Sequence, residues 1–229
     1  MTSRETADFG AGKGYDDWMH FYLAGRCGVL GDVDPSVVIA GFGFMAPRAV
    51  HALWPSVLEI APARRAAAYY TEACESYGRT TLAEMAETDA CRLGDLLEKV
   101  VDTADVSGLP LFAGWKAMPR PTDVRGRAMF LIHVLREWRG GIHVACITAA
   151  DLTPLEAIML NGGPDYARLF GWPQPWGDGN GKQQQLDDAE QATTARCAEV
   201  LDLTLTEAQQ EELIDLLTRA AYLMSPRSA

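Results

Sequence analysis

Residues 128–156 read AMFLIHVLREWRGGIHVACITAADLTPLE, and this stretch decides the fold class. Its apolar side chains recur at three- and four-residue spacing, which is typical of a helix that buries one face. We expect a helix over residues 128–139, a break at Gly140–Gly141 and a second helix over residues 142–149. The closing Thr-Pro-Leu-Glu of residues 153–156 is a capping box, which predicts the start of a further helix.

The preceding sequence has the same helical character. Asp34 followed by Pro35 is a typical helix start. Residues 36–54 are almost wholly apolar, with a break expected at Pro47, and residues 63–82 form an alanine-rich stretch that predicts a helix. No segment combines alternating hydrophobicity with hairpin turns. We therefore predict an all-α fold, built as a helical bundle-like domain with a helical C-terminal segment.

Composition divides the chain into four parts. Residues 1–14 are polar and glycine-rich, which predicts a flexible N-terminus, and residues 15–170 form the main helical domain. Residues 171–187 are rich in Pro, Gly and Gln and predict a linker. Residues 188–225 then form a C-terminal helical segment, whose apolar stripe must be buried against the same chain or against a partner.

Charge and cysteine content exclude several classes of protein. The 229 residues hold 31 acidic and 20 basic side chains, a net charge of -11, which disfavours a general grip on nucleic acid or on an anionic membrane. Five cysteines without a C-x-x-C pair predict buried, reduced thiols. No apolar run is long enough to serve as a signal core or a membrane span. We expect a cytoplasmic protein without a membrane, cofactor or metal.

The densest group of functional side chains is Arg136, Glu137, Arg139 and His143. His133 shares a helix face with Glu137, and the expected glycine break would let His143 fold back toward them. A histidine–glutamate pair supplies a general base, so Glu137 and His143 are the candidate catalytic residues. The two arginines form a fork that suits an anionic substrate.

A second interpretation of the same residues remains open. They would equally form a buried salt-bridge network that joins two helices. A metal site made of His133, Glu137 and His143 has suitable ligand types but no familiar spacing. Arg26 and Tyr22, four residues apart, either join the substrate-binding group or cap the surface of their own helix.

Aromatic side chains give two further candidates. Trp18 and Trp115 are expected to line a substrate pocket, although core positions are the more common place for such residues. His51 follows an apolar run and is interpreted as a core histidine.

Two stretches carry a resemblance to a known family. FYLAGRCGVLG at residues 21–31 is similar to a Tyr-Phe-x-x-Arg-x-x-x-Leu-Gly opening. LREWRGGIHVA at residues 135–145 resembles a Leu-Arg-Glu-His-Arg-Gly-x-x-His-Val-Ala signature. Both belong to an uncharacterised actinobacterial family that is labelled as helix-turn-helix proteins, and the resemblance covers residues 15–170.

The chain departs from that family at two places. Members begin with a further helical segment, and they carry a winged-helix segment where this chain has the linker that follows Gly171–Trp172. We therefore expect that the part that would enter a DNA groove is missing. The uncovered apolar surface predicts a homo-oligomer or a dedicated partner protein.

Three classes of function follow from these residues and this resemblance. The favoured class is a cofactor-free enzyme of actinobacterial natural-product biosynthesis. As a lyase, cyclase or isomerase it would act on a small anionic substrate by acid/base chemistry, including ring closure that expels sulfate or phosphate. The alternative is a small-molecule-binding or accessory protein derived from a regulator family. A DNA-binding transcriptional regulator is the least favoured class.

Overall fold

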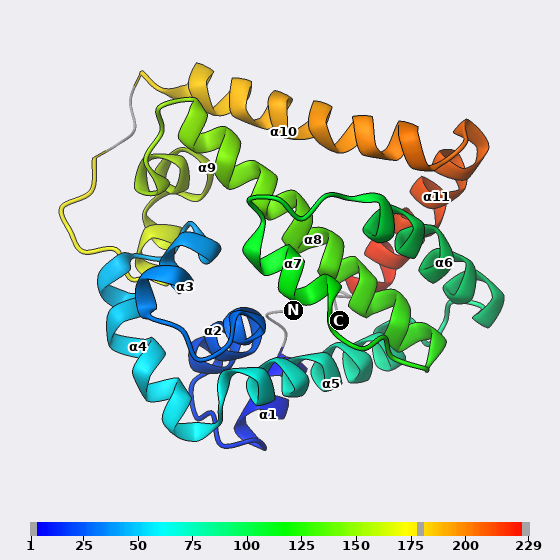
Figure 1. Ribbon diagram of the computed structural model, residues 1–229, viewed down its shortest axis with the longest axis horizontal. Helices are drawn as coiled ribbons and strands as arrows, with labels where there is room; N and C mark the ends of the chain where they lie inside the picture. The colour runs from blue at the N-terminus through cyan, green and yellow to red at the C-terminus, as the bar shows by residue number, and fades with distance from the viewer. Residues whose placement is uncertain (1–3, 178–180, 226–229) are drawn as a thin grey trace.

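The computed structural model describes residues 4–177 and 181–225, and these residues form eleven α-helices, one short 3-10 helix and no strand. The predicted all-α fold is confirmed. Figure 1 shows α8 (Val124–Ala149) crossing the middle of the molecule, with the other helices arranged around it.

Helix α8 corrects the expectation of two helices separated at Gly140–Gly141, because it continues through both glycines for 26 residues. A Cβ atom on Gly141 would lie 2.7 Å from Cδ2 of Leu109. The missing side chain therefore admits a neighbouring segment against the helix instead of ending it. As a result, His143 stays on the helix and does not fold back.

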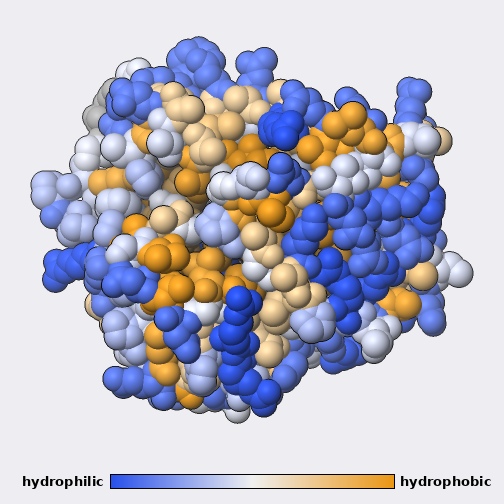
Figure 2. All heavy atoms as spheres, in the orientation of Figure 1, coloured by the Kyte–Doolittle hydropathy of each residue, from blue (hydrophilic) through white to orange (hydrophobic). Residues whose placement is uncertain are grey.

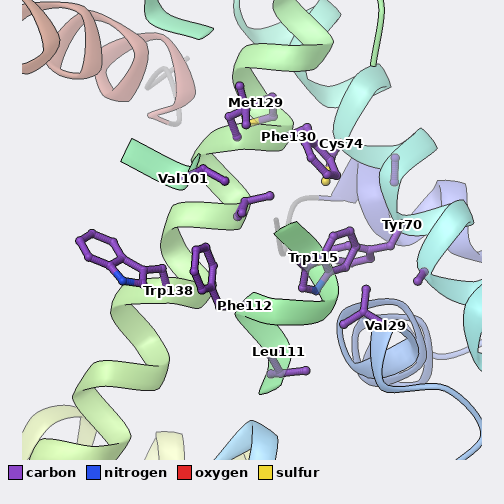
Figure 3. Packing of buried hydrophobic residues seen from close by; sticks show 14 of the residues in the cluster. Val29, Tyr70, Cys74, Val101, Leu111, Phe112, Trp115, Met129, Phe130 and Trp138 are labelled. Atoms are coloured by element: carbon purple, nitrogen blue, oxygen red, sulfur yellow. The ribbon is translucent and has the colours of Figure 1, made fainter. Parts of the chain in front are cut away.

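Four helices pack directly on α8: α5 (Ala63–Thr81), α6 (Glu87–Thr103), α7 (Pro110–Lys116) and α10 (Gln183–Thr204). The core forms where they meet. Figure 3 shows Trp115 and Phe112 of α7 lying between α8 and Tyr70 of α5, and all three side chains are fully buried. The short α7 thus acts as a wedge that fills the centre of the bundle.

The N-terminal half supplies a layer of shorter helices beside α8, namely α2 (Trp18–Cys27), the 3-10 helix (Gly28–Leu30), α3 (Pro35–Phe42) and α4 (Pro47–Ile60). The side chain of Asp34 caps α3 as the sequence predicts, and Pro47 opens α4 at the expected break. Figure 1 shows α3 and α4 at one end of the molecule, next to α9 (Pro154–Leu169).

The remaining helices close the two ends of the chain. Within the segment predicted to be flexible, α1 (Arg4–Ala11) packs against α2 and α5. Helix α11 (Glu207–Met224) begins at a capping box on Thr206, and its stripe of Leu213, Leu216 and Ala220 is buried in the common core. The division into domains stays a prediction, and residues 1–3 and 178–180 of its flexible N-terminus and linker lie outside the described residues.

Two broader expectations can be compared with the described residues. No single helix among them has the length and apolar character needed to cross a membrane, and the bent pair of α8 and α9 meets the test only when the two are taken together. All five cysteines are free, with Cys27 and Cys74 buried. On the face shown in Figure 2, hydrophobic atoms gather near the middle, between α3 and the beginning of α7.

Candidate functional site

An ion pair between Arg26 of α2 and Glu137 of α8 lies at the centre of the predicted site. Arg26 Nε donates to Oε1 and Oε2 of Glu137 at 2.8 and 3.0 Å, and only 1% of the Glu137 side chain is exposed. Burial alone would raise the pKa of Glu137. The charge of Arg26, its hydrogen bonds to the carboxylate and the charge of Arg136 together outweigh burial and hold this pKa below the usual glutamate value. Glu137 is therefore a buried, paired carboxylate.

A cavity of about 480 Å³ opens beside this pair, between α2, α3, α6, α8 and the end of α9. Its walls are mainly aromatic and aliphatic, and its cationic groups are three arginines. The lining residues are Tyr22, Arg26, Phe42, Phe44, Leu97, Ile132, Leu135, Arg136, Arg139, Gly140, Phe170 and Leu217. Four residues predicted to bind a substrate, Tyr22, Arg26, Arg136 and Arg139, thus line one cavity.

Arg136 and Arg139 extend from the α8 side of the cavity and remain about half exposed. Arg136 Nη2 donates to the Tyr22 hydroxyl at 2.9 Å, and its Nη1 lies 3.2 Å from the same Glu137 oxygen that pairs with Arg26. Arg139 donates to Glu190 of α10 at 2.8 Å. The group thus consists of a buried ion pair at the base of the cavity and two half-exposed arginines at its rim, and the substrate-binding interpretation stays a prediction.

The two histidines lie apart from each other and differ in their surroundings. His143 Nδ1 is 3.3 Å from the Thr193 hydroxyl, and Nε2 is 3.6 Å from Glu190. His133 is enclosed between Trp115 and Tyr70, and neither ring nitrogen has a hydrogen-bond partner among the described residues. Burial lowers the pKa of His133 to about 3, so this ring is neutral at physiological pH.

The two tryptophans predicted for the site have different places. Trp115 is fully buried in the core, where its indole nitrogen donates to the backbone oxygen of Arg26 at 2.9 Å. It supports the site from behind and does not line the cavity. Trp18 is partly exposed and packs against Tyr22, with ring centroids 6.1 Å apart.

Helices α3 and α4 form a second feature of the fold, which we call the helix–turn–helix unit. Eight residues of α3 are followed by a four-residue turn that opens with Gly43, at φ 83°, and then by α4. A Cβ on Gly43 would lie 2.5 Å from Cγ2 of Val144, so the turn is seated closely on α8. The chain thus contains two successive helices, of 8 and 14 residues, joined by a tight glycine turn.

Sequence reasoning did not single out this unit, and it expected the part that would enter a DNA groove to be missing from the chain. The signal was present as Gly43 and Pro47 between two apolar runs, because a glycine turn followed by a proline at the first helical position separates two helices. His51 of α4 is exposed, so its interpretation as a core histidine is wrong. Trp54 fills the core position instead.

Comparison with known proteins identifies the family and corrects the function. A family model described as a helix-turn-helix family matches residues 2–182. No curated protein and no solved structure matches the chain. The predicted cofactor-free enzyme is wrong, because this match points to a DNA-binding regulator-like protein and gives no support for an enzyme. The individual roles expected for Glu137 and His143 stay predictions.

The match extends over most of the chain and includes α1 to α9, with the helix–turn–helix unit and the α2 and α8 sides of the arginine-lined cavity. The chain therefore belongs to the helix-turn-helix family.

Proposed function

We propose that this chain is a ligand-responsive, DNA-binding regulator that contacts DNA through α3 and α4. One observation carries the proposal: Phe42 and Phe44, on either side of Gly43 in the turn of the helix–turn–helix unit, both line the arginine-rich cavity. A molecule bound in the cavity would touch the turn that orients α4. DNA binding and ligand binding would then share a structural element.

The exposed side of α4 suits the role of the groove-entering helix. Arg48, His51 and Ala52 are exposed and lie at three- and four-residue spacing, so they share one face. The opposite face is fixed in the core by Trp54, whose indole nitrogen donates to the backbone oxygen of Val33 at 2.8 Å. A rigid helix with an arginine near its N-terminus is what base or phosphate contact requires.

The charge balance sets the expected strength of this interaction. With a net charge of -11, the molecule as a whole repels DNA, so affinity must come from a few local cations. Arg64 and Arg65 are exposed at the start of α5, which follows α4 directly after Ala61–Pro62. We expect few phosphate contacts and hence a shallow dependence of affinity on salt concentration.

The experiment is a selection from a random-sequence duplex library with the full chain at low salt, followed by fluorescence anisotropy on the enriched duplex. Arg48→Ala should weaken binding by about 1–3 kcal/mol, the cost of losing one base or phosphate contact. Arg168→Ala is the control, since this exposed arginine already pairs with Asp165. Failure to enrich any duplex, together with no binding at low salt, would overturn the proposal.

The predicted homo-oligomer belongs to the same proposal. A two-fold pair of chains would present two α4 helices to successive half-sites of a duplex. Leu203 of α10 and Ile214 of α11 are 81% and 64% exposed, and they are apolar side chains that such a partner would cover. Sedimentation equilibrium should give twice the monomer mass, and a monodisperse monomer at all concentrations would contradict this part.

The resemblance of residues 135–145 to an actinobacterial group supports the same assignment at a finer level. An actinobacterial origin and a place in natural-product biosynthesis stay predictions.

A further inference from the structure

The charges around the cavity do not cancel. Three guanidinium groups line it, and two carboxylates face them. Glu137 pairs with Arg26 through both carboxylate oxygens, and Glu190 pairs with Arg139. Arg136 shares an oxygen of Glu137 at 3.2 Å, and its other hydrogen bond within the part of the chain that the structure describes is to the hydroxyl of Tyr22. One positive charge therefore remains at the cavity, and Arg136 holds it.

An incoming molecule can reach Arg136 as well as Arg139, but Arg139 already has a carboxylate of its own in Glu190. The side chain of Arg136 is 52% exposed, whereas that of Arg26 is 11% exposed and lies behind it. The hydroxyl of Tyr22 accepts hydrogen bonds from Arg136 Nη2 at 2.9 Å and from Arg26 Nη1 at 3.3 Å, which leaves its own proton to donate to an oxygen bound beside Arg136. A guanidinium with a neighbouring hydroxyl is a good site for a carboxylate, because charge-assisted hydrogen bonds are strong and directional.

Aromatic rings line much of the rest of the cavity. Phe42 meets Tyr22 and Phe170 edge-on, with ring centroids 5.9 Å apart in both pairs. The Arg26 guanidinium lies 4.3 Å from the centroid of Phe42, and so fixes that ring in place. Aromatic groups prefer such offset and edge-to-face neighbours, and the volume of about 480 Å³ lies within the usual range for small ligands.

We propose that this cavity binds a planar aromatic monocarboxylate, with its carboxylate on Arg136 and Tyr22 and its ring among Phe42, Phe44 and Phe170. One negative charge balances the one unpaired cation, and the three rings enclose the apolar part. The inference rests on the proposed function for its consequence: because Phe42 and Phe44 adjoin the Gly43 turn, occupancy of the cavity changes the affinity of α4 for DNA.

The test is calorimetric titration of the full chain, without DNA, with naphthalene-2-carboxylate. Three matched probes accompany it: the neutral naphthalene-2-carboxamide, acetate and inorganic sulfate. We expect saturable binding of the aromatic carboxylate and at least about tenfold weaker binding of the amide, which keeps the shape and loses the charge. Acetate and sulfate lack the ring, and we expect no saturable heat from either.

Variants separate the site from general effects of charge. Arg136→Gln should weaken binding about tenfold or more, and Arg136→Lys should lie between it and the unaltered chain, because it keeps the charge without the fork. Arg219→Gln is the control, since Arg219 is 54% exposed on α11 and pairs with Asp89 outside the cavity. Equal binding of the amide, equal affinity of Arg136→Gln, or no saturable binding of the carboxylate at millimolar concentration would each overturn the inference.

The two proposals fail separately. If the chain binds the carboxylate but the selection enriches no duplex, the DNA-binding proposal alone is contradicted. If a duplex is enriched but calorimetry shows no binding of the carboxylate, the ligand proposal alone is contradicted. With both present, saturating naphthalene-2-carboxylate should shift the anisotropy curve on the duplex. An unchanged curve would refute the link through Phe42 and Phe44.

Discussion

Replacing Glu137 by glutamine should test the buried ion pair most directly. Arg26 keeps its proton at any physiological pH, because an arginine pKa lies above about 12. Its side chain is 11% exposed, and glutamine would leave its charge without a buried counter-charge. Removing one partner of a buried pair costs about 3–5 kcal/mol, and we expect a value near 3 because glutamine retains one acceptor oxygen.

Urea unfolding and thermal unfolding, both followed by circular dichroism, measure the loss in free energy and the fall in Tm. For a chain of this size, about 3 kcal/mol corresponds to a fall in Tm of roughly 6–12 °C. Glu190→Gln is the matched control, since its pair with Arg139 has the same 2.8 Å separation but is about half exposed and should contribute about 0–1 kcal/mol. The double variant Arg26→Met with Glu137→Leu should recover most of the loss.

Three outcomes would show that the reasoning about this pair is wrong. These are a loss below about 1 kcal/mol for Glu137→Gln, a loss equal to that of Glu190→Gln, or a double variant less stable than the single one. The last outcome would mean that the ion pair itself stabilises the fold more than an apolar pair of similar size does.

Other predictions concern the buried histidine and three glycines. The pKa of His133 falls from about 6.5 to about 3 on folding, so its neutral form stabilises the fold above pH 6.5 and this stability is lost as pH falls toward 3. At pH 5 the loss of unfolding free energy is about 2 kcal/mol. In His133→Leu the urea midpoint should therefore change less between pH 7 and pH 5 than in the unaltered chain, and an equal change in both would refute this prediction. Gly140→Ala meets nothing within 4 Å and should stabilise α8 by up to about 1 kcal/mol. Gly141→Ala meets Leu109 at 2.7 Å and should be less stable than Gly140→Ala in thermal unfolding; the reverse order would contradict the packing. Gly43→Ala, at φ 83°, should destabilise by at least about 1 kcal/mol, and no loss would show that the turn relaxes freely.

Local chemistry made parts of the fold predictable. The caps at Asp34, Thr153 and Thr206 begin helices because their side chains satisfy nearby backbone N–H groups, which needs no distant partner. The all-α class followed in the same way from helical spacing of apolar residues. Grouping Arg136 and Arg139 with Arg26 and Tyr22 was also within reach, since polar side chains in an apolar setting tend to gather.

The glycine pair shows where local reasoning failed. Gly140 and Gly141 carry low helix propensity, and sequence alone cannot tell a stop from a close approach. In the structure Leu109 packs closely against Gly141 and the helix continues. His143 therefore stays on α8, beside Thr193. The error in the functional class had a different origin: acid/base residue types suggested an enzyme, and the family match corrected it.

The helical class, several helix starts and the set of charged residues available to a site were predictable from the sequence, because these depend on near neighbours in the chain. Only the tertiary structure decided that Glu137 is buried on Arg26, 111 residues away, while Arg136 next to it keeps an unmatched charge at a cavity. Adjacent residues on a helix point in different directions, so the helix that packs against each side sets which residue is buried. Burial in turn sets how strongly each charge interacts with its neighbours.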